Sequence, residues 1–333
     1  MSTTLTPPAT RILRPGDPCW DVARRAWTLA DEQHPAAVAA PGSVADIAAA
    51  ISFARRSGLR VAAQGTGHGA ASLGSLIGTL LIKTHHMRHV TIDPVAMTAR
   101  AEAPDPVRGR WFALADIVQA GSPAVADEIL RPLRSLAPAR DTVGTVPVQA
   151  LGQLRTDPDR PEPIAGDGLM LASLSPEAVG ALLRAAGPEP LSLLTAVELR
   201  HAGGELGRVG PGNGALAAVD GEFALSAAGR APTAVAAASV ALGVEAVTSA
   251  MRPWSARQMY LNIAGTTRDP ASFWPAPAYA RLRSVKAAVG PGDLIHSNHP
   301  IPSAASGEKA TVPEHQASAP WNRADRPRSS GKA

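Results

Sequence analysis

A glycine-dense turn between two apolar runs constrains this 333-residue chain more than any other feature. Residues 59–63 have the length and apolar content of a buried strand, and Gln64-Gly65-Thr66-Gly67-His68-Gly69 follows them directly. A second buried strand is predicted over Thr79–Lys83. Glycines permit positive φ angles and let backbone N–H groups converge on an anion without obstruction by Cβ. The spacing is neither the Rossmann nor the P-loop pattern. On the residues alone, a tight loop between two strands therefore stays an equal alternative to a phosphate-binding loop.

The residues before this turn predict a strand followed by a helix. Residues 36–40 form a short apolar run. Ser43 is a plausible N-cap, and the helix is expected to end near Gly58. Its apolar stripe is expected from Val44, Ile47, Ile51 and Phe53.

The rest of the chain predicts further alternation of strands and helices. Residues 90–93 and 98–103 are expected to pair as a hairpin. Further strands are predicted at residues 112–118, 169–174 and 197–201, and helices at residues 123–135, 176–186, 232–251 and 279–289. The two ends of the chain differ in composition from the part between them. Residues 1–19 are expected to form an irregular arm, and residues 303–333 a disordered tail with too few apolar groups to fold. The tail carries a small basic excess, for which a solvated segment is favoured over polyanion binding.

Composition excludes several classes of protein. The single cysteine, Cys19, excludes an internal disulfide framework and a multi-cysteine zinc site. A net charge of +4 is no nucleic-acid signature, which requires basic residues clustered on one face. No signal-peptide core is seen near the N-terminus, and no uninterrupted apolar run reaches the ~18 residues of a membrane span. We therefore expect a cytoplasmic protein that acts on a small molecule, without nucleic acid or membrane as a partner.

At the glycine turn the chain resembles a known family. The run Pro35-Ala-Ala-Val-Ala-Ala-Pro41, the turn itself and the later Ile92-Asp93 are similar to the start of the FAD-binding PCMH-type domain of the vanillyl-alcohol oxidase superfamily. The nearest branch is that of the berberine-bridge-enzyme-like and 6-hydroxynicotine-oxidase-like oxidases. The resemblance implies that Gln64, Gly65, Thr66, Gly67, His68 and Gly69 contact FAD. It also implies that His68 can be bonded covalently to the flavin.

The resemblance returns near the C-terminus. Tyr260-Leu261-Asn262 resembles the family's Tyr-x-Asn motif, although the aromatic residue that often follows is Ile263 here. The resemblance places Asn262 at the cofactor and makes Tyr260 a candidate catalytic base, for which a buried core tyrosine is an equal alternative. Asn298 and His299 resemble residues that lie close to the flavin, with loop capping as the alternative from the residues alone.

The chain departs from the family's pattern after residue 103. A family member continues into the second half of the flavin domain, whereas here Pro104 opens a segment that resembles the substrate domain. A block on the order of 100 residues, the size of a small domain, is therefore expected to be absent. The remaining strand 98–103 is then expected to leave an open sheet edge, and FAD binding is expected to be weaker.

Two other groups of polar residues are candidates for chemistry. His85, His86 and His89, with Asp93, could bind a divalent cation, but His85 and His86 would point to opposite faces of a strand, so exposed polar residues are favoured. Glu198 and His201 could act as acid and base. Strand alternation places Glu198 beside Arg200 instead, and a surface ion pair is favoured.

The sequence thus predicts an α+β fold. It comprises an arm (1–19), the first part of a PCMH-type FAD-binding domain (20–103), a substrate-like antiparallel sheet with helices on one face (104–255), a segment returning to the FAD domain (256–302) and the tail (303–333). The implied activity is FAD-dependent oxidation of an alcohol or amine C–H with dioxygen as acceptor, impaired by the missing block. The alternative is a non-catalytic remnant that holds no FAD.

Overall fold

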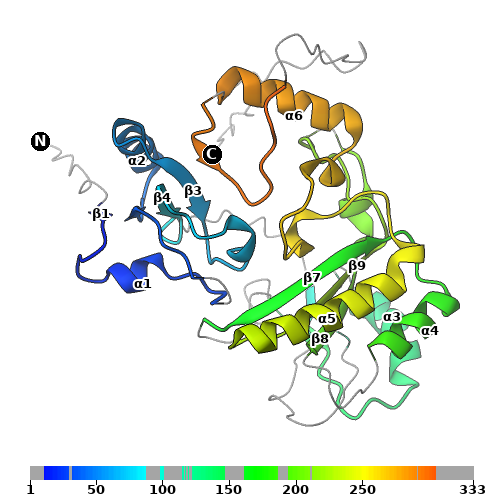
Figure 1. Cartoon of the computed structure of the whole chain (residues 1–333). Helices are drawn as coiled ribbons and strands as arrows, with labels where there is room; N and C mark the ends of the chain where they lie inside the picture. Colours follow the sequence, from blue (N-terminus) through cyan, green and yellow to red (C-terminus); the bar gives the residue numbers. More distant parts are fainter. Residues whose placement is uncertain are drawn as a thin grey trace, which may run out of the picture.

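The two larger sheets of the described residues differ in topology, and a late segment runs from the second back to the first (Figure 1). The structure is a computed structural model that describes residues 11–29, 32–87, 98–100, 115, 117, 119, 122–146, 161–186, 194–210, 212–290 and 292–304. The predicted hairpin strand 90–93, His89 and the tail from residue 305 lie outside these residues.

The first sheet has five strands in the order β1-β2-β4-β3-β10. They are β1 (Ile12–Leu13), β2 (Ala37–Ala39), β4 (Thr79–Lys83), β3 (Arg60–Gln64) and β10 (Ile295–His296). The last four strands run parallel and β1 is the antiparallel edge. All five residues of β4 are buried, as expected for a parallel strand covered on both faces.

Helix α2 (Val44–Arg56) covers one face of this sheet. Ser43 caps it, because the Ser43 side chain accepts a hydrogen bond from the Asp46 backbone N–H at 3.2 Å. The predicted apolar stripe is wrong at its first position, since Val44 is exposed and the buried helix positions are Ala50 and Ala54. These small side chains pack with β2, β3 and β4 in one core cluster, which allows the helix to lie close to the sheet.

The opposite face of the first sheet is covered by short elements. Helix α1 (Trp20–Arg24) and the 3-10 turn η1 (Ala71–Leu73) pack there against the other side of β2, β3 and β4. Leu73 and Leu81 are buried in this second cluster. The loop that precedes η1 is the glycine turn, so the packing of η1 fixes where that loop ends.

The second sheet is antiparallel, in the order β7-β9-β8. Its strands are β7 (Ile164–Leu171), β9 (Phe223–Arg230) and β8 (Leu194–His201). Helices α4 (Pro176–Ala185) and α5 (Ala234–Met251) pack on one face. Leu171, Leu225 and Val240 are fully buried between them. The predicted antiparallel sheet with helices on one face is confirmed.

Helix α5, extended by η4 (Arg252–Trp254), is long and apolar enough to cross a membrane by length and composition alone. Its Val244, Val247 and Met251 pack into the core of the second sheet. Helices that form the core of a folded domain pass the same length and composition test.

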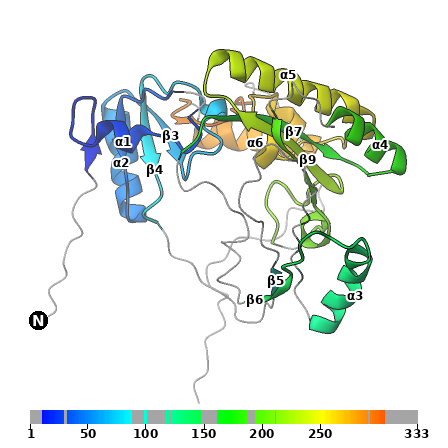
Figure 2. The same ribbon diagram turned by 90° about the horizontal axis from the view of Figure 1, so that it is seen from below.

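The hairpin predicted between residues 90–93 and 98–103 involves residues outside the described ones, and the structure gives strand 98–100 another partner. Strand β5 (Thr98–Arg100) pairs antiparallel with β6 (Gly144–Val146), a segment that the sequence did not indicate as a strand. Backbone N–H and C=O groups need partners, and β6 supplies them to β5. In Figure 2, β5, β6 and helix α3 (Pro123–Arg134) project away from the two main sheets. The strand predicted at residues 112–118 is not found at its described positions, Ala115 and Ile117.

The return segment joins the two sheets. After α5 it passes through η5 (Leu261–Ile263), η6 (Pro270–Phe273) and helix α6 (Ala276–Val289). It then enters the first sheet as β10, where Ile295 pairs with Val61 of β3. Residues far apart in the chain are thereby brought to the space between the sheets (Figure 1).

Candidate functional site

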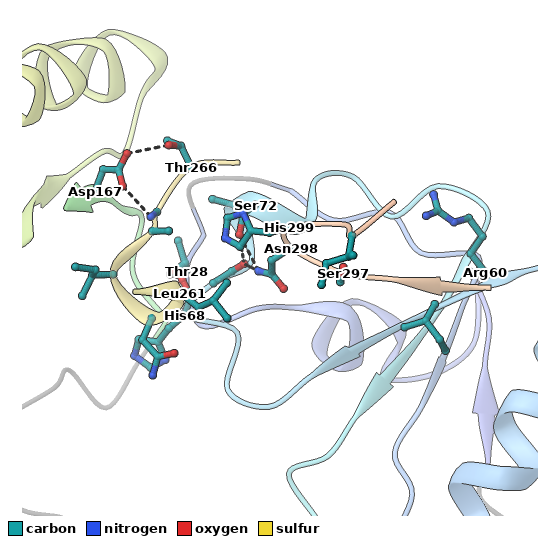
Figure 3. Close-up of a pocket in the computed structure, with 18 of the residues that line it drawn as sticks. Thr28, Arg60, His68, Ser72, Asp167, Leu261, Thr266, Ser297, Asn298 and His299 are labelled. Carbon is teal, nitrogen blue, oxygen red and sulfur yellow. Dashed lines mark hydrogen bonds between the residues drawn. The ribbon is translucent and has the colours of Figure 1, made fainter. Parts of the chain in front are cut away.

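A cavity of about 1730 Å³ lies where the first sheet, the second sheet and the return segment meet (Figure 3). The glycine turn contributes His68 and Gly69, and the helix-free face of the second sheet contributes Arg200 and Ser226. This volume exceeds the roughly 300–1,000 Å³ of a typical small-molecule site. It therefore has room for a dinucleotide-sized cofactor together with a substrate.

The carbonyl groups of the glycine turn are occupied by a neighbouring segment. Trp27 N–H donates to the Thr66 carbonyl at 3.1 Å, and Thr28 N–H donates to the Gly67 carbonyl at 3.4 Å. The Thr28 hydroxyl donates to the His68 carbonyl at 3.2 Å. These three hydrogen bonds hold the turn against residues 27 and 28.

The N–H groups of the same turn, in contrast to its carbonyl groups, lack hydrogen-bond partners among the described residues. Among the described residues, none of the backbone N–H groups from Gly65 to Gly69 donates a hydrogen bond. Free backbone N–H groups of a glycine-rich turn are donors with which proteins bind phosphates. Of these five residues, His68 and Gly69 line the cavity, and Gly65, Thr66 and Gly67 are not among its lining residues. The turn thus fits the pyrophosphate of a dinucleotide cofactor.

Gly67 is the position at which glycine is required. Its φ angle is +98°, in the region that L side chains rarely adopt. A Cβ there would overlap the buried Gln64 side-chain amide and would lie 2.9 Å from Trp27 N. Gln64 itself does not line the cavity. Its side chain is buried next to Gly67.

His68 is presented to the cavity in a restrained orientation. Its ring stacks on Trp27, with centroids 4.1 Å apart and planes 13° apart. Its Nδ1 bonds to the Thr66 hydroxyl at 2.8 Å, and the residue is exposed. Nε2 has no hydrogen-bond partner in the described part of the chain, so this ring nitrogen is open to a ligand.

Lys83 anchors residues 25–28, the segment whose Trp27 and Thr28 bond to the glycine turn. The side chain is buried, and Nζ donates to the Arg25 carbonyl at 2.9 Å. Burial lowers the pKa of this ammonium group, because removing a charge from water is unfavourable. Its one described hydrogen bond fixes residue 25, two residues before Trp27.

The return segment brings Asn298 to the glycine turn across more than 200 residues of sequence. Its amide donates to the Gly69 carbonyl at 2.6 Å and to the Ser72 hydroxyl at 2.7 Å (Figure 3). Asn298 therefore fixes the C-terminal end of the glycine turn, just before η1 begins. His299 follows it, buried, and also lines the cavity.

Burial and the neighbouring Arg268 guanidinium hold the pKa of His299 below its ordinary value, while Asp167 acts in the opposite direction. The ring packs against Phe273, with centroids 4.5 Å apart. His299 is therefore expected to be neutral near pH 7.

Two residues of the Tyr-x-Asn motif have different positions. Asn262 is exposed and lines the cavity, with no side-chain hydrogen bond to a described residue. Tyr260 packs against Met170, Ala202 and Ala224 and is not among the residues that line the cavity. The structure thus brings Asn262 together with the glycine turn, Asn298 and His299, and leaves Tyr260 in a neighbouring apolar cluster.

The other polar candidates lie outside this constellation. Glu198 and Arg200 form the predicted ion pair, 2.9 Å apart, while His201 packs against Phe223. His85 and His86 are not on opposite faces as predicted, because β4 ends at Lys83 and their rings meet in the following turn at 4.1 Å. Among the described residues, no three His, Cys, Asp or Glu side chains gather as a metal site.

Sequence reasoning missed Trp27 and Asp167. Trp27 lies in a segment without periodicity, and nothing local predicts its stacking on His68. Asp167 does carry a signal, since it is a carboxylate between Gly166 and Gly168 in an otherwise apolar run. A charged residue in a predicted core strand requires partners, and those partners come from about 100 residues later in the chain.

Comparison with known proteins agrees with this geometry. Residues 35–106 match the family described as FAD binding domain. Glucooligosaccharide oxidase from Sarocladium strictum is 36% identical over 76 residues, which is 22% of this chain and only 15% of that protein. The chain therefore matches a small part of this curated relative.

Solved structures match over most of the chain. Wild-type BBE-like 1 from Physcomitrella patens has a TM-score of 0.67 at 11% identity, covering 89% of this chain and 97% of the other. The 6-hydroxy-D-nicotine oxidase from Arthrobacter nicotinovorans has a TM-score of 0.64 at 13% identity, covering 88% and 97%. At such low identity these matches show the fold alone. Together with the family match, they confirm the resemblance to FAD-binding PCMH-type oxidoreductases.

Proposed function

We propose that this chain is an FAD-dependent oxidoreductase whose cofactor lies in the cavity with its pyrophosphate on the glycine turn. The single observation that carries the proposal is the set of free N–H groups from Gly65 to Gly69, next to the open ring of His68. FAD, when bound, would accept a hydride from an alcohol or amine C–H and pass the electrons to dioxygen. The protein's contribution is to bind, orient and enclose the reactants.

Each part of the cavity has a role in this proposal. The glycine turn holds the pyrophosphate, and Asn298 fixes the end of that turn through Gly69 and Ser72. Asn262 and His299 lie on the return segment, where they face the space left for the flavin ring and the substrate. Tyr260 stays a candidate base only if it leaves its apolar cluster on ligand binding.

The helix-free face of the second sheet would carry the substrate. This face is built from small residues, Gly166, Ser226 and Ala228, with Arg200 as its charged group. Small side chains leave room for a substrate on this face, and the Ser226 hydroxyl and the Arg200 guanidinium can hydrogen-bond the hydroxyl groups of a small hydroxylated molecule. The likeness to glucooligosaccharide oxidase makes oligosaccharides the first class to test.

We further propose that FAD is held weakly, on the expectation from the family resemblance that the second half of the flavin domain is absent after residue 103. The protein is then expected to be isolated with less than one flavin per chain. The alternative of a non-catalytic remnant requires that added FAD is not taken up either.

Loss of the His68 ring tests the covalent form of the proposal. After incubation with FAD and acid precipitation, the wild-type pellet is expected to keep the flavin absorbance and His68→Ala to lose it. Thr66→Val is a matched control that removes the hydroxyl on Nδ1 and leaves the ring. The FAD-loaded protein should release hydrogen peroxide with glucose oligosaccharides. A colourless wild-type pellet together with no peroxide from any alcohol or amine would contradict the proposed oxidase.

A further inference from the structure

Asp167 is the centre of a hydrogen-bond network at the edge of the cavity. Its Oδ1 accepts from Gly168 N–H at 2.9 Å and from Gly265 N–H at 3.1 Å. Its Oδ2 accepts from the Thr266 hydroxyl at 2.8 Å and from Arg268 Nη2 at 2.6 Å. Four donors, three of them from the return segment, thus meet one carboxylate of β7. Figure 3 shows the contact between Asp167 and Thr266.

Glycines make this meeting possible. The return segment lies directly on β7, and a Cβ at Gly265 would overlap the Gly166 carbonyl. The Asp167 side chain is only 15% exposed, so these donors take the place of water around its carboxylate oxygens. These four hydrogen bonds are more than a simple surface ion pair forms. Three of them join the second sheet to the return segment.

Arg268 carries the network onward to His299. Its guanidinium bonds Asp167 and also the Gly168 carbonyl at 3.3 Å. Its backbone N–H donates to His299 Nδ1 at 3.4 Å. A ring nitrogen that accepts a hydrogen bond carries no proton, so the proton of the neutral ring lies on Nε2.

The Nε2 atom of His299 opens onto the cavity. It has no hydrogen-bond partner among the described residues, and it is not sealed from solvent as the orphan Nδ1 of His296 is. Phe273 covers the face of the ring, and the charged groups that act on it are Arg268 and Asp167. The ring is therefore held by the Arg268 backbone N–H at Nδ1 and by Phe273 at its face, and its Nε2 stays free to donate.

We propose that Asp167 and Arg268 are positioning residues that hold His299 with its proton on Nε2, so that His299 meets the ligand as a hydrogen-bond donor and not as a base. The matching ligand atom is a carbonyl oxygen or an aromatic ring nitrogen, both of which the flavin ring system carries. The ligand half of this inference rests on the proposed FAD binding. The tautomer half is a property of the protein without ligand.

Nitrogen-15 NMR of the histidine-labelled, ligand-free protein tests the tautomer half. The His299 signals are identified by their loss in His299→Gln. They are expected to show a proton on Nε2 and a bare Nδ1. Arg268→Lys keeps the charge but removes the guanidinium nitrogen that bonds both Asp167 and the Gly168 carbonyl, and a mixture of tautomers is expected. Asp167→Asn should have the same effect, and His296→Gln, whose Nε2 bonds the Leu73 carbonyl, should leave the His299 signals unchanged. A proton on Nδ1 in the wild-type protein would overturn the inference.

Titration with FAD tests the ligand half. His299→Ala should weaken FAD binding about tenfold, the effect of one lost hydrogen bond. His299→Gln, whose amide can place a donor near the same point, should recover most of that loss. Equal FAD affinities for wild type, His299→Ala and His299→Gln would overturn this half. If the wild-type protein takes up no FAD, the proposed function fails, and the NMR result alone then confirms or overturns the positioning by Asp167 and Arg268.

Discussion

FAD binding is expected to be lost when Gly67 is replaced by alanine. The φ angle of +98° strains any L side chain, at a cost of about 1–2 kcal/mol. The new Cβ would also meet the Gln64 amide and the backbone of Trp27 and Ala26, and overpacking of this kind costs typically about 1–3 kcal/mol. Trp27 and Ala26 contribute backbone atoms, which cannot rotate away. The turn must therefore move, and its N–H groups lose their common direction.

The measurement is the FAD dissociation constant of Gly67→Ala, with an expected weakening of about 100-fold or more, since each 1.4 kcal/mol is tenfold. Gly65→Ala is the matched control in the same turn. Its φ angle is ordinary, and its Cβ would meet nothing closer than the Thr84 hydroxyl at 3.9 Å. The control should bind FAD within about threefold of wild type. An unchanged affinity in Gly67→Ala would show that the turn does not hold the cofactor.

A second large effect is expected from Gly265→Ala, this time on stability. A Cβ at this position would overlap the Gly166 carbonyl of β7 and approach Asp167 Cα at 3.3 Å. The return segment would have to lift from the sheet, and Asp167 would lose the Gly265 N–H and the Thr266 hydroxyl. Partial loss of partners around a mostly buried carboxylate, added to the overpacking, should lower the free energy of unfolding by about 3 kcal/mol.

Urea unfolding followed by tryptophan fluorescence measures this effect. Gly290→Ala is the control, because Gly290 also lines the cavity but its Cβ would make only ordinary contacts, at 3.7 Å from Lys286. It should change the free energy of unfolding by less than about 1 kcal/mol. If both variants unfold at the same urea concentration as wild type, the return segment is not seated on β7 as the structure has it.

The features that the sequence predicted well depend on local chemistry. The Ser43 cap, the buried strand Thr79–Lys83 and the glycine turn are each specified by a few consecutive residues. The C-terminal Asn298 could be connected to the turn only through the family resemblance, because its partners Gly69 and Ser72 are more than 200 residues away. No periodicity within residues 290–300 contains that information.

The features that the sequence missed depend on tertiary partners. Strand β6 was not predicted, and it pairs with β5 across about 45 residues of sequence. Val44 fits a helical stripe by spacing, yet the helix turns Ala50 and Ala54 to the sheet because small side chains allow the closer approach. Asp167 and Arg268 were not singled out, since each looks like a solitary charge until the fold brings them together at 2.6 Å.

The central claim is that the cavity between the two sheets holds FAD. The most direct test is a titration of the purified wild-type protein with FAD, followed by quenching of the flavin fluorescence. The expected result is saturation at one FAD per chain, with a dissociation constant for the complex before covalent attachment on the order of micromolar, about −8 kcal/mol. Flavin fluorescence that stays unchanged at protein concentrations of about 100 μM would contradict the claim.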